Sequence, residues 1–356
     1  MNNAQITAKG DAFVMNTYKR IPVAFVKGEG SWLWDADGNK YLDFLSGLAV
    51  NCLGYNHPVM VKAISEQAAK VMHTSNLYWV GPQVELAKVL VKQSGLGKAF
   101  FCNSGAEANE SAIKLARKYA KAKMGEDKYG IITFTSSFHG RTLATLAATG
   151  QTKYQKGFEP LPEGFGYAKY GDLEDLEGKI TNNTCAVMLE PIQGEGGINV
   201  PTAEFLKGVR DLCDKKGLLL IFDEVQCGIG RTGKFFAHQN FGVKPDILTL
   251  AKSLAGGFPI GAMVASDEVA EGFGPGDHAS TFGGNHLACS TALAVVNHIL
   301  QDNIMEHNAK MGAYLMGKFE ELKEKYSFIK EVRGMGLMIG IQLEADGNWV
   351  LDQCQK

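Results

Sequence analysis

The chain contains 356 residues, and its 36 basic and 38 acidic side chains leave a formal net charge of −2. This balance, without any block of basic residues, argues against nucleic acid or an anionic membrane as a partner and favours small molecules. Because no apolar run approaches the roughly 18 residues that span a bilayer, and the polar N-terminus has no signal-peptide pattern, we expect a cytoplasmic protein.

The first predicted element is a hairpin, in which residues 32–34 and 40–42 flank a turn-forming stretch. From about residue 81 to residue 298, helices with apolar residues three and four positions apart alternate with short apolar strands. This alternation predicts an α/β fold with a mostly parallel central sheet and helices on both faces. The strands are expected at 99–101, 131–134, 185–189, 218–222, 247–250 and 262–265, and the helices near 83–93, 109–122, 203–215 and 287–300.

After residue 300, a charged helix at 310–325 and an apolar strand at 339–343 predict a small α+β piece. The chain is longer than the roughly 250–300 residues at which single cores stop growing. We therefore expect a large domain at 51–298 and a small domain built from residues 1–50 and 299–356. The small domain is expected to be truncated, because residues 349–354 resemble a helix start with no stop signal.

The seven cysteines form no C-x-x-C pair, and most stand inside apolar segments. They are typical of small buried hydrophobic side chains, so the sequence predicts neither disulfides nor a structural metal.

Two strand ends carry residues with a shared chemical use. Asp223 follows the strand at 218–222, and Lys252 follows the strand at 247–250, about one strand–connection–strand unit later. Burial favours the neutral amine that a Schiff base requires, and an acid can keep a pyridine nitrogen protonated. Together they predict a pyridoxal phosphate site, against the alternative of a solvated lysine and a helix-capping aspartate.

Two further loops are expected at the same edge of the sheet. The small residues at 103–108 lead into a helix, whose N-terminal N–H groups suit a phosphate, although Ser-Gly at such a place is often only a cap. In the loop after the next strand, Phe138 could stack on a planar cofactor and Arg141 could bind a carboxylate. Core packing and a surface cation are the alternatives for these two residues.

Several stretches, taken together and in order, match a known family. Over residues 16–343 the sequence closely resembles the class III pyridoxal-phosphate-dependent aminotransferases. The resemblance implies PLP fold type I, aspartate aminotransferase-like, with a mostly parallel central sheet, helices on both faces and a small α+β domain. The matching stretches are residues 103–108, 138–142, 190–197, 223–226 and 230–233, Lys252, and residues 280–285.

The resemblance also implies roles for individual residues. Lys252 would form the Schiff base and move the proton, while Asp223 would pair with the pyridinium nitrogen. Gln226 would contact the ring hydroxyl and Phe138 would stack on the ring. The phosphate would be held by one subunit and reached by Thr281 of the partner subunit, which implies a homodimer with a shared site. The phosphate-binding residues of the first subunit would be Ser104, Gly105 and Ala106.

For substrates, the resemblance implies contacts from Arg141, Glu195 and Ser280. Arg141 would bind the carboxylate remote from the reacting amine, and Glu195 would pair with a second arginine until 2-oxoglutarate arrives. That arginine lies in a C-terminal stretch of the family that has no counterpart before Lys356. The 2-oxoglutarate half-reaction is therefore expected to be impaired.

Within the class, residues 75–78, 101–104 and 276–280 most resemble the members that act on N-acetylornithine, in arginine biosynthesis. Members acting on ornithine, succinylornithine or 4-aminobutyrate share most motifs and remain alternatives, as does a truncated protein that only binds cofactor. The 42 glycines also suggest a dinucleotide-binding oxidoreductase. That class is disfavoured, because no G-x-G-x-x-G run directly follows a predicted strand.

Overall fold

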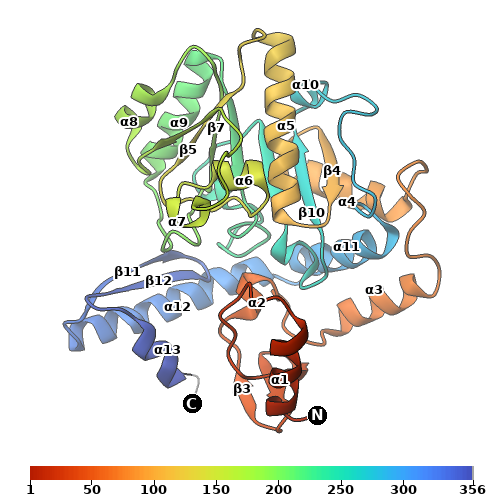
Figure 1. Cartoon of the computed structure of the whole chain (residues 1–356), viewed down its shortest axis with the longest axis vertical. Coiled ribbons are helices and arrows are strands. Elements are labelled where there is room, and N and C mark those ends of the chain that lie inside the picture. The colour runs from red at the N-terminus through yellow and green to blue at the C-terminus, as the bar shows by residue number, and fades with distance from the viewer. Residues whose placement is uncertain (355–356) are drawn as a thin grey trace.

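The computed structural model describes residues 1–354 and is built around one seven-stranded sheet (Figure 1). Its strand order is β4 (Lys98–Cys102), β10 (Gly261–Ala265), β9 (Ile247–Leu250), β8 (Leu219–Asp223), β7 (Thr184–Leu189), β5 (Gly130–Phe134) and β6 (Phe165–Ala168). The last five strands in this order pair in parallel, whereas β10 is antiparallel to both neighbours. The prediction of a mostly parallel sheet is confirmed.

Helices cover both faces of this sheet, because successive side chains of each strand point to opposite faces. In β8, Leu220 and Phe222 enter one core cluster, while Leu219 and Ile221 enter the other. The first cluster also takes residues from α4 (Gly81–Ser94), α8 (Leu173–Lys179), α9 (Ala203–Lys216) and α11 (His286–Gln301). The second takes them from α5 (Gly105–Lys123) and α10 (Asp267–Ala270). The short helices α6 (Leu143–Ala148) and α7 (Thr152–Gln155) follow β5.

The N-terminal segment forms a three-stranded sheet outside the large one. Trp34 pairs with Lys40 across the predicted hairpin, and Asp35 closes its turn by accepting hydrogen bonds from the Asp37 and Asn39 amides. The elements here are α1 (Asn3–Phe13), β1 (Phe25–Glu29), β2 (Trp32–Asp35), β3 (Lys40–Leu42), α2 (Ser46–Ala49) and α3 (Pro58–Ala68). The predicted hairpin is therefore present.

The C-terminal segment adds a long helix and a two-stranded hairpin beneath the large sheet (Figure 1). Its elements are α12 (Ile304–Lys325), β11 (Ile329–Met335), β12 (Met338–Leu343) and α13 (Asn348–Cys354). None of the helices within residues 1–354 combines the length and the apolar character that a membrane crossing requires.

Candidate active site

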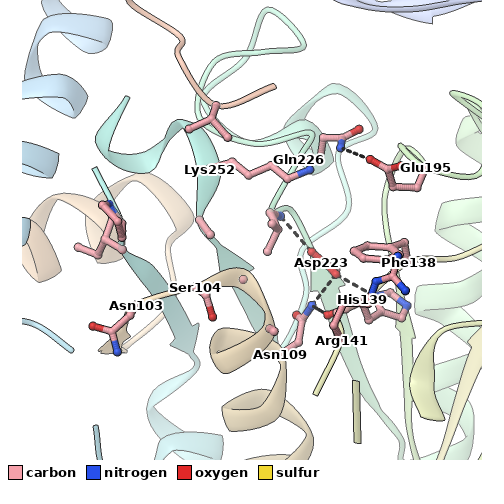
Figure 2. A pocket seen from close by; sticks show the side chains of 18 of the residues that line it. Asn103, Ser104, Asn109, Phe138, His139, Arg141, Glu195, Asp223, Gln226 and Lys252 are labelled. Carbon is pink, nitrogen blue, oxygen red and sulfur yellow. Dashed lines mark hydrogen bonds and ion pairs between the residues drawn. The ribbon is translucent and has the colours of Figure 1, made fainter. Parts of the chain in front are cut away.

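A cavity of about 440 Å³ lies where the parallel strands end, within the size range of small-molecule pockets. Its walls come from the loops after five strands, so residues distant in sequence face one another (Figure 2). The side chains that the argument uses are Ser104 after β4, Phe138 to Arg141 after β5, Glu190 and Glu195 after β7, Asp223 and Gln226 at β8, and Lys252 after β9.

Lys252 opens a short 3₁₀ helix, η2 (Lys252–Ala255), directly behind the buried strand β9. Its φ of +44° is a left-handed backbone angle that non-glycine residues seldom adopt. The side chain extends across the cavity toward Gln226 and Glu195 (Figure 2). Burial lowers the pKa of the Lys252 amine, and the nearby carboxylates of Glu195 and Asp223 partly oppose this effect. The neutral, nucleophilic amine is therefore more accessible here than in an exposed lysine.

Asp223 is held by a buried network of side chains at the floor of the cavity. Its Oδ2 accepts a hydrogen bond from Asn109 Nδ2 at 2.7 Å and lies 2.8 Å from His139 Nδ1. Its Oδ1 accepts from the Val225 amide at 3.0 Å. Asn109 is itself fixed, because its Oδ1 accepts from Thr249 Oγ1 at 2.6 Å and its Nδ2 also donates to the His139 carbonyl. The Asp223 carboxylate thus has one orientation.

Sequence reasoning assigned no role to Asn109 or His139. His139 follows Phe138 in the same loop, so the sequence already indicated that His139 lies near the site. Asn109 lies in the interior of α5, and its contact with Asp223 depends on how that helix packs against β8. No local pattern indicates such a contact.

The start of α5 provides the donors of a phosphate site. Ser104 is the N-cap, and its Oγ accepts from the Glu107 amide at 3.2 Å, so the capping interpretation of this serine is correct. The N–H groups of Gly105 and Ala106 nevertheless have no partner within the helix. A Cβ at Gly105 would lie 2.7 Å from Val225 Cγ1, so only glycine fits this packing.

At the rim of the cavity, polar side chains are held more loosely. Gln226 Nε2 donates to Glu195 Oε1 at 3.4 Å, and a Cβ at Gly194 would overlap the Gln226 amide. The Arg141 guanidinium carbon lies 4.1 Å from the centre of the Tyr154 ring. Among residues 1–354 no carboxylate lies within ion-pair distance of Arg141, so its charge is available to a ligand.

Glu190 is a second buried acid in the wall of the cavity. Its Oε1 accepts from the Phe138 amide at 3.0 Å, and its Oε2 accepts from the Gly194 amide at 2.9 Å. Burial raises the pKa of Glu190 to about 7, and the neighbouring Asp223 carboxylate adds to this shift. Its sequence stretch was recognised, but its role as a link between two loops was not.

Two predicted site residues, Ser280 and Thr281, do not reach this cavity. They line a second cavity of about 790 Å³, beside the exposed side chains of Leu77, Tyr78 and Trp79. Ser280 Oγ accepts a hydrogen bond from Asn103 Nδ2 at 3.1 Å. Within one chain the structure therefore brings together every other predicted site residue, but not these two.

Comparison with known proteins gives consistent matches along nearly the whole chain. The family model described as class-III aminotransferase matches residues 13–356. The chain is 56% identical to the acetylornithine aminotransferase of Methanocaldococcus jannaschii, over 94% of this chain and 84% of that protein. It is 52% identical to that of Clostridium acetobutylicum, over 96% and 89%.

Among the solved structures with the same fold are the following two aminotransferases. The ornithine aminotransferase of Toxoplasma gondii has a TM-score of 0.93 at 34% identity, over 98% of this chain and 83% of that chain. The acetylornithine aminotransferase of Elizabethkingia anophelis has a TM-score of 0.86 at 36% identity, over 99% and 88%.

Proposed function

Because this chain belongs to the class III aminotransferases, as the family model and the sequence relatives show, we propose that it acts on N2-acetyl-L-ornithine. It would transfer the terminal amino group to 2-oxoglutarate, giving N-acetyl-L-glutamate 5-semialdehyde and L-glutamate in arginine biosynthesis. The predicted class and its α/β fold type I are confirmed. The substrate is proposed from the relatives at 46–56% identity, whose names specify acetylornithine.

The residues of the cavity fit pyridoxal phosphate. The open N–H groups of Gly105 and Ala106, beside Ser104, suit the phosphate. Phe138 offers a ring face, and Asp223 offers a carboxylate fixed by three hydrogen bonds. Gln226 would contact the ring hydroxyl, and Lys252 would attach the cofactor through Nζ. When bound, the cofactor supplies a protonated pyridine ring that accepts the electron pair released at the substrate carbon.

Lys252 is proposed to move the proton. Burial lowers the pKa of its amine, so Nζ is deprotonated more readily than that of a solvated lysine. The neutral Nζ can then remove a proton from the carbon that bears the terminal amine of the substrate. The short 3₁₀ helix that begins at Lys252 keeps this side chain directed across the cavity.

Asp223 is proposed to keep its negative charge directed at the ring nitrogen. Asn109 and His139 both contact Oδ2, so the carboxylate cannot rotate away when the substrate changes. Such preorganisation is most effective in a site that excludes water, and Asp223 is only 3% exposed.

Arg141 is proposed to bind the α-carboxylate of the amine donor. Its guanidinium has no carboxylate partner within residues 1–354, and the Tyr154 ring supports it from one side. Binding the α-carboxylate at Arg141, and not beside Lys252, would present the terminal amine, and not the acetylated one, for reaction. This unpaired arginine in the same cavity as the lysine is the structural observation that supports the substrate suggested by the relatives.

A homodimer is proposed to complete the site. Leu77, Tyr78 and Trp79 are 87%, 71% and 90% exposed beside the cavity that contains Ser280 and Thr281. Large apolar side chains gathered on a surface favour a protein interface. Thr281 of the partner subunit would then reach the phosphate.

We also propose a cytoplasmic location, and a division of the chain into a large domain at 51–298 and a small domain formed by the remaining residues.

The proposal is tested with purified protein and pyridoxal phosphate. An absorption band that follows the protein through gel filtration would support cofactor binding. Rates with 2-oxoglutarate and each of N-acetylornithine, ornithine, N-succinylornithine and 4-aminobutyrate would then rank the donors. We expect N-acetylornithine to have the highest kcat/KM, and a preference for 4-aminobutyrate or ornithine would overturn the substrate assignment.

A dinucleotide-binding oxidoreductase fits the structure poorly. Residues 228–233 do spell G-x-G-x-x-G, but they lie in turns and do not open an α-helix. A helix N-terminus at that place is what would bind the pyrophosphate. If the purified protein had no pyridoxal absorption band and its melting temperature rose on adding NAD, this alternative would be favoured.

A further inference from the structure

The loop that carries Glu195 is a tight turn closed by a pair of backbone hydrogen bonds. The Gln193 amide donates to the Asn199 carbonyl at 3.1 Å, and the Asn199 amide donates back at 3.2 Å. The Asn199 side chain tightens the turn further, because its Nδ2 donates to Gln193 Oε1 at 2.8 Å and to the Gly196 carbonyl at 3.2 Å. We call residues 193–199 the Glu195 turn.

One arginine from the C-terminal hairpin holds this turn. Arg333 in β11 donates from Nε to the Gly197 and Ile198 carbonyls at 2.9 and 3.2 Å, and from Nη2 to the Gly197 carbonyl at 2.8 Å. Its Nη1 donates to Glu331 Oε2 and Gln342 Oε1, both at 2.7 Å. The guanidinium therefore connects the Glu195 turn to side chains of both hairpin strands.

The opposite strand of the hairpin also approaches the turn closely. Gly340 in β12 is the cross-strand partner of Arg333. A Cβ at Gly340 would lie 3.0 Å from Ile198 Cβ and 3.3 Å from the Gly197 carbonyl oxygen. Contacts from both strands converge on the same two residues, so the hairpin and the turn are packed as one unit.

The backbone of the turn needs such support. Ile198 has a φ of +55°, a left-handed conformation that is a clear outlier for a β-branched residue. Strained residues of this kind persist only where the surrounding contacts over-determine them. On the side of the large sheet, the Gly194 amide donates to the Glu190 carboxylate, and Gly196 packs closely against the Ser136 carbonyl. Gln193 Nε2 also donates to the Thr135 carbonyl at 2.9 Å, and further contacts come from Arg333 and Gly340.

Glu195 projects from this turn into the cavity, where its position has electrostatic consequences. It accepts from Gln226 Nε2 at 3.4 Å, a long contact that by itself fixes the side chain weakly. Of the carboxylates near Lys252, Glu195 does most to raise the pKa of the Lys252 amine. A displacement of the turn would therefore change the field that an incoming substrate meets beside Lys252.

We propose that Arg333 is a positioning residue that holds the Glu195 turn, so that the C-terminal hairpin determines how the cavity discriminates between its two substrates. This inference rests on the proposed function. The amine donor carries a terminal ammonium, which the Glu195 carboxylate attracts. 2-Oxoglutarate carries only carboxylates, which Glu195 repels. Releasing the turn should therefore weaken donor recognition and leave acceptor recognition unchanged or improved.

The structural half of the proposal is tested by hydrogen–deuterium exchange on the full chain, with and without pyridoxal phosphate. We expect Arg333→Met to accelerate exchange at residues 193–199 by about tenfold or more, because three hydrogen bonds to the turn are lost. Lys330→Gln is the matched control, because Lys330 lies on the same strand and pairs with the exposed Glu344 at 3.0 Å, away from the turn. Equal exchange in Arg333→Met and the wild type would overturn the proposal.

The functional half is tested by steady-state kinetics, which give a separate KM for the amine donor and for 2-oxoglutarate. Arg333→Met should raise KM for the amine donor roughly three- to tenfold, with KM for 2-oxoglutarate unchanged or lower. Arg333→Lys should lie between it and the wild type, because lysine keeps the charge but not the planar fork. A general loss of kcat with both KM values unchanged would indicate a merely structural residue and overturn the proposal.

A double-mutant cycle shows whether Arg333 acts through Glu195. If it does, Glu195→Gln and the double variant should have the same donor-to-acceptor selectivity. Multiplicative effects of the two substitutions would overturn the proposal. If the protein transaminates none of the donors, the proposed function fails. The exchange experiment still tests, independently of activity, whether Arg333 holds the Glu195 turn.

Discussion

The floor and the rim of the cavity are held in different ways. At the floor, Asp223, Asn109 and Thr249 are buried and joined by hydrogen bonds of 2.6–2.7 Å. At the rim, Glu195 has a single side-chain contact at 3.4 Å, and Arg141 is exposed, with aromatic rings as its neighbours. The difference teaches which groups serve a permanent ligand and which serve exchanging ones. A cofactor that stays favours a preorganised floor, whereas two substrates that alternate require an adaptable rim.

The largest effect is expected for Lys252→Ala. Loss of Nζ removes the attachment point and the proton acceptor together, so turnover should fall on the order of 10⁴-fold or more. Circular dichroism should show an unchanged fold, because the side chain only lines the cavity. Lys252→Arg is the control that keeps a charge but no neutral amine, and it should be equally inactive. Near-normal turnover in either variant would contradict the assignment.

Asp223→Asn tests whether the floor acts through charge or through shape. The amide keeps the size of the side chain but loses its charge, so we expect a loss of roughly 10²- to 10³-fold in rate with cofactor retained. Single-turnover spectra, normalised to bound cofactor, measure this separately from binding. If cofactor binding collapses while the rate per bound cofactor is normal, Asp223 is only an anchor.

Glu190 links floor to rim, and its titration should appear in the stability of the protein. Its pKa is raised by burial from 4.5 to about 7, so the folded chain keeps a proton that the unfolded chain loses between these values. The stabilisation is complete below pH 4.5 and is lost as the pH rises through 7. Relative to Glu190→Gln, the wild type should therefore lose about 2–3 kcal/mol of unfolding free energy between pH 5 and pH 8.

Urea unfolding of both proteins at the two pH values measures this difference. Groups that do not interact with Glu190 titrate alike in the two proteins, so their contributions cancel. A constant offset between wild type and Glu190→Gln at pH 5 and pH 8 would show that Glu190 does not hold its proton in the folded state.

The smallest effect is expected at the rim, for Arg141→Lys. Lysine keeps the charge but cannot form a bidentate pair, so KM for the amine donor should rise about tenfold with little change in kcat. Lys153→Gln is a suitable control, because Lys153 also lies over the Tyr154 ring, at 4.7 Å, and is not assigned to the substrate. A similar rise in both variants would mean that Tyr154, and not a carboxylate contact, is being perturbed.

Much of the sheet was predictable because its strands are continuous apolar runs. The predicted strand at 131–134 lies within β5, and that at 247–250 coincides with β9. β6 was not predicted, because Phe165–Ala168 is a run of only four residues that is interrupted by a glycine. Nor was the antiparallel direction of β10, since strand direction depends on pairing partners and leaves no local pattern. β11 was missed because its sequence is charged and contains glycine.

The site was predictable to the extent that its residues stand at strand ends. Lys252 and Asp223 were located in this way, and the parallel pairing of β8 with β9 brings them to the same edge. Asn109, in a helix interior, and Thr249, inside a strand, meet only through packing. The hold of Arg333 on the Glu195 turn likewise joins segments more than 130 residues apart in the chain, which no spacing rule reveals.

The first turns of α5 serve two contacts at once, which restricts how homologous or engineered chains can vary here. Ser104 begins the helix at the proposed phosphate site, and Asn109 follows on the same rigid element to hold Asp223. Inserting one residue between them would rotate Asn109 by about 100° and shift it by about 1.5 Å. Insertions and deletions should therefore be excluded between residues 104 and 109, whereas the loop at residues 124–129, beyond the helix end, can change length without moving either contact.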